Sequence, residues 1–145
     1  MSDVVIDANV AVKALVPTEQ SISLDAQMVI WARQGTTLLV PPHFFSEVLN
    51  TLRRKVVQRE ITLADGDRLL EDFRAFPAQL VSVPRPFELA WILAKEYQLS
   101  GTYDAEYLAV AQLFGCEFWT ADKRFLRQLG SQRPDWVKSV ASDGT

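Results

Sequence analysis

The sequence contains little of what several common protein classes require. Among its 145 residues there is one cysteine, Cys116, and one histidine, His43. A single cysteine cannot form an internal disulfide, and with no secretion signal it favours a reducing cytoplasm. The same scarcity excludes a zinc site built from several cysteines and histidines. Any metal site in this chain must therefore be made of other side chains.

Long apolar runs are also missing. No run approaches the roughly 20 residues of a membrane helix, and Met1 leads into Ser2 and Asp3 without the basic and apolar stretches of a signal peptide. Apolar residues nevertheless make up 48% of the chain, with charged residues spread along it. We therefore expect one globular, cytoplasmic domain spanning residues 1–145.

The sequence also lacks an excess of positive charge. The net charge is −3, whereas proteins that bind phosphate backbones usually carry surplus Lys and Arg. Net charge misleads, however, when acids gather in one pocket to hold cations, because the bound metal then meets the phosphate. Composition leaves both interpretations open.

Short apolar runs alternate with segments of helical periodicity. The pattern predicts strands at residues 4–6, 38–40, 80–83, 117–120 and 136–140. It predicts helices at residues 9–16, 21–33, 43–59, 63–76, 86–99, 104–114 and 122–129. Such alternation is typical of a mostly parallel sheet covered on both faces, and the helices between the second and third strands would form a lobe beside it. The predicted fold is a three-layer α/β/α sandwich.

Four acids follow or lie near predicted strand ends. Asp7 ends the first strand, and Asp122 lies two residues beyond the strand at 117–120. Asp104 begins a helix, and Glu47 falls near the start of the helix that follows Pro41 and Pro42. Because ligand sites in open α/β sheets form beyond the carboxyl ends of the strands, these side chains can meet at one edge.

Each of the three aspartates also has a simpler explanation. Asp7, Asp104 and Asp122 are all good helix N-caps, and capping is the more common reason to find Asp at such a position. Glu47 is harder to explain in this way, because its helix face is otherwise largely apolar and a half-buried carboxylate needs a partner.

The side chains available as ligands limit which metal ions such a site could hold. Carboxylate oxygens suit the hard ions Mg²⁺ and Mn²⁺. A mechanism that uses two histidines is excluded, since His43 stands alone. We expect His43 to be a helix-start or surface residue.

Four motifs together resemble the PIN-domain family, and among its members the VapC-like toxins of type II toxin–antitoxin pairs. The motifs are Val-Ile-Asp7-Ala-Asn9 with Lys13, Ser46-Glu47-Val48, Tyr103-Asp104-Ala105-Glu106-Tyr107, and Phe118-Trp119-Thr120-Ala121-Asp122. Each is weak alone, but they occur in the family's order and with its typical spacing. The resemblance covers almost the whole chain.

The resemblance implies a metal-dependent endoribonuclease that cleaves single-stranded RNA, with Asp7, Glu47, Asp104 and Asp122 as catalytic and metal-binding residues. It implies one or two Mg²⁺ or Mn²⁺ ions that lower the pKa of a water for attack on the phosphate. Asn9 and Thr120 would help to order the site. A homodimer and a cognate antitoxin are further implications.

Basic side chains outside the acidic pocket would have to hold the RNA. Candidates are Lys13 and two groups that follow Glu47 and Asp122, namely Arg53, Arg54 and Lys55, and Lys123, Arg124 and Arg127. A solvated charged helix face explains these side chains equally well.

Other functions use similar acids. A phosphatase with an aspartyl-phosphate intermediate would use Asp7 as nucleophile, but such sites usually place a second Asp where this chain has Asn9. A phospho-receiver domain would lack the helical insertion that carries Glu47. A catalytically idle interaction module of the same fold is the third alternative.

Overall fold

The structure is a computed structural model that describes residues 2–16, 22–82 and 86–140. Its strands form one parallel sheet. The strand order is β3-β2-β1-β4-β5, and each neighbouring pair is parallel. The bounds are β1 Asp3–Ile6, β2 Thr37–Val40, β3 Ala78–Leu80, β4 Glu117–Thr120 and β5 Val137–Ser139.

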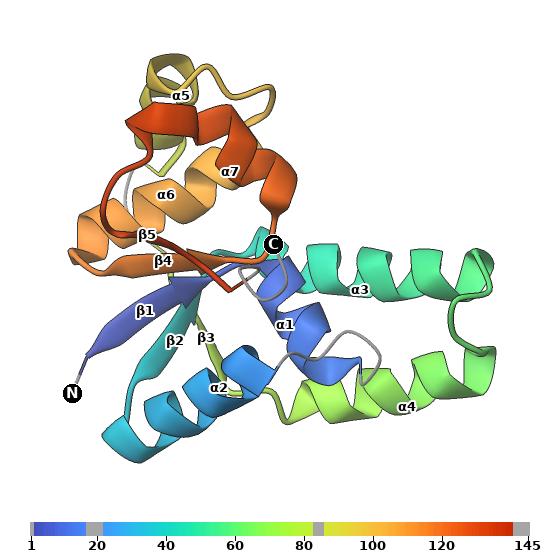
Figure 1. Ribbon diagram of the computed structural model, residues 1–145. Coiled ribbons are helices and arrows are strands. Elements are labelled where there is room, and N and C mark those ends of the chain that lie inside the picture. Colours follow the sequence, from blue (N-terminus) through green and yellow to red (C-terminus); the bar gives the residue numbers. More distant parts are fainter. Residues whose placement is uncertain (1, 17–21, 83–85, 141–145) are drawn as a thin grey trace.

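Helices cover both faces of this sheet, which confirms the predicted three-layer sandwich (Figure 1). In Figure 1, α5, α6 and α7 lie above the sheet and α1 and α2 below it, while α3 and α4 project to one side as an antiparallel pair. This pair is the predicted lobe. The bounds are α1 Ala8–Leu15, α2 Ile22–Gln34, α3 His43–Val57, α4 Leu63–Arg74, α5 Pro86–Glu96, α6 Thr102–Phe114 and α7 Lys123–Leu129, with a short 3₁₀ turn at Gly130–Gln132.

Local sequence explains where these elements form. In β1, Val4, Val5 and Ile6 are all buried, as expected for a strand covered on both faces. Every fourth residue of α3 faces the core, so Phe44 and Val48 are both fully buried. Thr62 caps α4 through a reciprocal capping box with Asp65, which confirms its predicted role.

The third strand was predicted too late in the chain. We expected residues 80–83, whereas β3 runs from Ala78 to Leu80. Its register pairs Ala78 with Leu38 and Leu80 with Val40. The apolar run misled the prediction because edge-strand pairing depends on register with β2 more than on local hydropathy. Val83 lies outside the described residues.

Four helices, α1, α3, α4 and α5, end one to three residues earlier than predicted, and left-handed residues lie just beyond α3 and α5. Arg59 has a φ of 61° beyond α3, and Gln98 has a φ of 54° beyond α5. These conformations stop the helical hydrogen-bond pattern.

Along the described residues, no helix combines the length and apolar character needed to cross a membrane.

Helix α6 offers a matched test of this core. Leu108 is fully buried, whereas Leu113 on the same helix is 50% exposed. Leu108→Ala should lower the free energy of unfolding by about 2–5 kcal/mol because it leaves a cavity. Leu113→Ala should cost less than about 1 kcal/mol. Urea unfolding measures both, and equal losses would contradict this placement of α6.

Candidate active site

The chain changes direction within the sheet between β1 and β4. From β1 it proceeds to β2 and β3 on one side, and it returns to place β4 and β5 on the other. A parallel sheet leaves a crevice beyond the carboxyl ends of the strands at such a point. Asp7 directly follows β1, and Asp122 lies two residues after β4. The two acids therefore occupy the same edge of the sheet.

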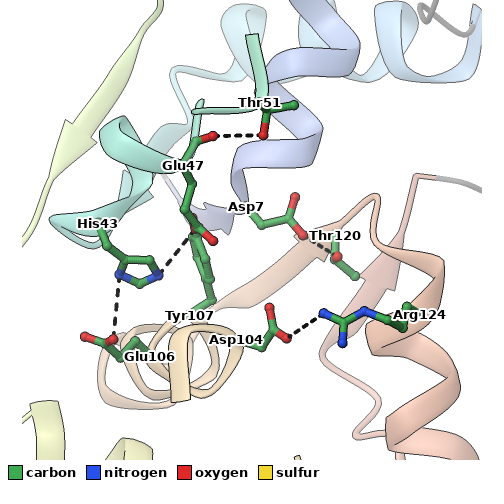
Figure 2. Close-up of polar contacts among 9 residues, drawn as sticks. All are labelled: Asp7, His43, Glu47, Thr51, Asp104, Glu106, Tyr107, Thr120 and Arg124. Atoms are coloured by element: carbon green, nitrogen blue, oxygen red, sulfur yellow. Dashed lines mark hydrogen bonds and ion pairs between the residues drawn. The ribbon is translucent and has the colours of Figure 1, made fainter. Parts of the chain in front are cut away.

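Asp7 is buried and held on both carboxylate oxygens. Its Oδ1 accepts a hydrogen bond of 2.9 Å from the backbone N–H of Val10, so it caps α1 as predicted. Its Oδ2 accepts a short hydrogen bond from the Thr120 hydroxyl (Figure 2). Burial, and to a lesser extent the charge of Asp122, nevertheless raise the pKa of Asp7 to about 7, against the effect of these two bonds.

Thr120 links two of the acids. Besides donating to Asp7, its Oγ1 accepts the backbone N–H of Asp122 at 3.0 Å. Asp122 in turn caps α7, because its Oδ1 accepts the N–H of Phe125 at 3.1 Å. One buried hydroxyl thus sets the position of Asp7 relative to the loop that carries Asp122.

Glu47 extends from α3 toward α6. Its Oε1 accepts a hydrogen bond of 2.6 Å from the Tyr107 hydroxyl and lies 3.5 Å from Nε2 of His43 (Figure 2). Both contacts use the same oxygen, and within the described residues no hydrogen bond reaches Oε2. Burial, and then the charge of Glu47, raise the pKa of Tyr107, so this hydroxyl stays a donor.

Asp104 completes the set of acids. It lies in the first turn of α6, where Gly101 is the N-cap residue. The prediction that Asp104 begins and caps this helix was therefore wrong: the helix starts at Thr102, and the Asp104 side chain is left for other contacts. Burial and the charge of Asp122 raise the pKa of Asp104 to about 6, while Arg124, whose Nη2 lies 3.9 Å from Oδ2, lowers it.

The four acids influence one another electrostatically. The charge of Asp122 acts on both Asp7 and Asp104, and the charge of Glu47 acts on Asp104. Like charges held this close oppose ionisation. The structure thus brings the four predicted acids close enough to influence one another's ionisation, and Asp7 and Asp122 act as helix caps in addition.

The donor set suits a hard divalent cation, because it consists of carboxylate oxygens whose mutual repulsion a cation would relieve. As the side chains are placed, no three Asp, Glu, His or Cys residues in the described part of the chain come close enough together to hold one ion. Asp7 and Glu47 are instead turned toward protein donors. The chemistry fits a metal, and binding one requires these side chains to reorient.

The other predicted residues lie farther from this set. Asn9 is exposed on α1, and among the described residues no hydrogen bond joins it to the acids. Of the basic candidates, Arg124 contacts an acid of the set, with its Nη2 3.9 Å from Oδ2 of Asp104. The remaining candidates are exposed or partly buried on α1, α3 and α7: Lys13, Arg53, Arg54, Lys55, Lys123 and Arg127.

Sequence reasoning missed the roles of two residues, His43 and Tyr107. His43 starts α3 as predicted, but it is not a surface residue: its side chain is 15% exposed, and Nδ1 lies 3.8 Å from Oε2 of Glu106. Tyr107 belongs to one of the four motifs, but the sequence analysis assigned no role to it. Both had a detectable signal, since His43 lies four residues before Glu47 and Tyr107 three residues after Asp104, each on a shared helix face.

The raised pKa of Asp7 predicts an unusual pH dependence of stability in EDTA. Between its ordinary value of 3.8 and about 7, the folded protein holds a proton that the unfolded chain releases. The contribution of Asp7 to stability is therefore present at low pH and lost as pH rises to about 7, at about 1.4 kcal/mol per pKa unit. Asp7→Asn, which keeps the cap, should flatten this fall in melting temperature.

Exposed Asp25 provides the control, because Asp25→Asn should leave the pH dependence as in the wild type. An identical pH profile for wild type and Asp7→Asn would show that Asp7 is not a buried acid.

Comparisons with known proteins agree with this geometry. A family model described as PIN domain matches residues 4–129. The VapC ribonuclease Mb0985 of Mycobacterium bovis is 32% identical over 121 residues, which cover 83% of this chain and 87% of that protein. The region matched by the family model contains all four acids.

Solved structures share the fold. PAE2754 from Pyrobaculum aerophilum aligns with a TM-score of 0.67 at 22% identity, covering 97% of this chain and 92% of that one. VapBC2 from Rickettsia felis, bound to a DNA fragment from its promoter, aligns with a TM-score of 0.66 at 12% identity, covering 94% and 96%.

Proposed function

The chain belongs to the PIN domain family, and from this premise we propose that it is a metal-dependent endoribonuclease that cleaves single-stranded RNA. It acts as one domain spanning residues 1–145. The observation that supports the proposal is the electrostatic proximity of four acids near the carboxyl ends of β1 and β4, namely Asp7, Glu47, Asp104 and Asp122.

The proposed metal ligands are these four carboxylates, and the proposed ions are one or two Mg²⁺ or Mn²⁺. A divalent cation bound there would offset the carboxylate charges, bind the scissile phosphate and make a water more acidic. Burial and neighbouring carboxylates raise the pKa values of Asp7 and Asp104, and a cation bound there would lower both by favouring the ionised forms.

The chain's own side chains would orient the acids. Thr120 holds Asp7 and the backbone of Asp122 through one hydroxyl, which supports its proposed ordering role. Tyr107 holds one oxygen of Glu47 and leaves the other available. Asn9, exposed at the start of α1 two residues after Asp7, remains a proposed ordering residue.

Substrate binding requires cations around the acidic crevice. Arg124 is the strongest candidate, because it lies beside Asp104 and is 61% exposed. We propose that it contacts the RNA backbone next to the cleaved bond. The basic residues of α3 and α7, with Lys13, would extend this path: Arg53, Arg54, Lys55, Lys123 and Arg127.

We further propose that the protein is a VapC-like toxin, forms a homodimer and is inhibited by a cognate antitoxin. Support comes from the relative named as a VapC ribonuclease and from the shared fold of VapBC2. An idle PIN-fold interaction module is the remaining alternative, and activity assays distinguish the two. Family membership disfavours a phosphatase or receiver domain.

Neutral substitutions test the acids individually. Asp7→Asn, Glu47→Gln, Asp104→Asn and Asp122→Asn should each lower the rate of RNA cleavage by at least about 100-fold, because each removes a charge that holds the cation. Wild-type activity should require Mg²⁺ or Mn²⁺ and disappear in EDTA. The measurement is cleavage of a labelled single-stranded RNA by purified protein.

Asp25→Asn is the matched control, since Asp25 is an exposed aspartate on α2. If one of the four variants retains near-normal turnover, the substituted residue does not belong to the active site. Full cleavage in excess EDTA contradicts the metal mechanism.

Metal binding should also stabilise the fold. An ion that binds only the folded protein raises its melting temperature, by an amount that grows with ion concentration. Millimolar Mn²⁺ should therefore raise the wild-type melting temperature by several degrees, and Asp104→Asn should shrink that rise while stabilising the protein in EDTA. An unchanged wild-type melting temperature would contradict a clustered metal site.

A further inference from the structure

A groove lies beside the acidic crevice, separated from it by one imidazole ring. Its volume is about 450 Å³, within the range of small-ligand sites. It is bounded by the start of α3, the chain after β3, the start of α5 and the first turns of α6. Its lining includes His43, Val81, Ser82, Phe87, Tyr103 and Glu106.

His43 connects the groove to the acids. Its Nε2 lies 3.5 Å from Glu47, in the crevice, and its Nδ1 lies 3.8 Å from Glu106, in the groove (Figure 2). Neither ring nitrogen makes a hydrogen bond to a described residue. A ligand in the groove would therefore lie one side chain away from the proposed reaction centre.

Two aromatic side chains of the groove are open to a planar ligand. Tyr103 is 64% exposed and Phe87 is 76% exposed. One face of Tyr103 is stacked on His43, with centroids 5.0 Å apart and planes 24° apart. A flat ring placed on the other face of Tyr103 would extend this stack, as unpaired nucleobases do on aromatic side chains.

The polar groups of the groove select the kind of ligand. Glu106 supplies a carboxylate that accepts hydrogen bonds. Guanine presents two adjacent in-plane N–H donors, which match two carboxylate oxygens as an arginine fork does. Adenine and cytosine offer only an amino group, and uracil flanks its N–H with carbonyl oxygens.

We propose that this groove is a nucleobase subsite that binds one unpaired guanine of the RNA, stacked on Tyr103 and hydrogen-bonded to Glu106. The inference rests on the proposed ribonuclease function and adds base selectivity to it. Tyr103 and Glu106 are then specificity residues, and cleavage occurs preferentially beside a guanine.

Nucleosides test the subsite without cleavage or metal, because they carry no phosphate. NMR titration of the full chain in EDTA should show guanosine binding about ten-fold more tightly than inosine, which lacks the 2-amino group, or adenosine. Glu106→Gln should bring these affinities within about two-fold. Tyr103→Leu, at an exposed position, should weaken the binding of all three nucleosides.

Glu96→Gln, on the exposed last turn of α5, is the matched control and should keep the selectivity. Equal binding of the three nucleosides by the wild type, or no binding, overturns the proposal. Binding of N-acetylarginine amide through Glu106 without guanosine selectivity also overturns it, in favour of a peptide ligand. RNA cleavage assays then test the ribonuclease function separately.

Discussion

The parallel pairing of β1 with β4 is the constraint on which the rest of the site depends. Their register sets Ile6 opposite Trp119, so both strands end at the same level of the sheet. The N–H of Asp7 bonds to the carbonyl of Trp119, and the hydroxyl of Thr120 bonds to the Asp7 carboxylate. Because these bonds join the two strand ends directly, Asp7 and Asp122 cannot separate without breaking the centre of the sheet.

Electrostatic repulsion between the carboxylates opposes this arrangement of the acids. Asp7 and Asp104 are desolvated and face other carboxylates, which raises both pKa values. A fold selected only for stability would not keep such groups together, and strain of this kind usually marks a functional site. The hydrogen bonds from Thr120 and Tyr107 reduce the free-energy cost of burying the carboxylates of Asp7 and Glu47.

Helices α3 and α6 provide the second half of the crevice. Glu47 and Asp104 reach it from helices that follow different strands, and Tyr107 joins the two helices through its bond to Glu47. The same helices carry His43 and Glu106, so the crevice and the neighbouring groove share one supporting framework. A ligand in either place would therefore influence the other through a single imidazole.

The sequence by itself determined the layered α/β fold, most element positions and the caps at Thr62, Asp7 and Asp122, because hydrophobic period and capping are local properties. The catalytic role of the acids stays a prediction. Tertiary structure alone decided the register of β3, the burial of His43 and the bond from Tyr107 to Glu47. Helical spacing places His43 near Glu47 and Tyr107 near Asp104 on their own helices, but contacts between residues far apart in the chain, such as the bond across 60 positions from Tyr107 to Glu47, form only in the folded protein.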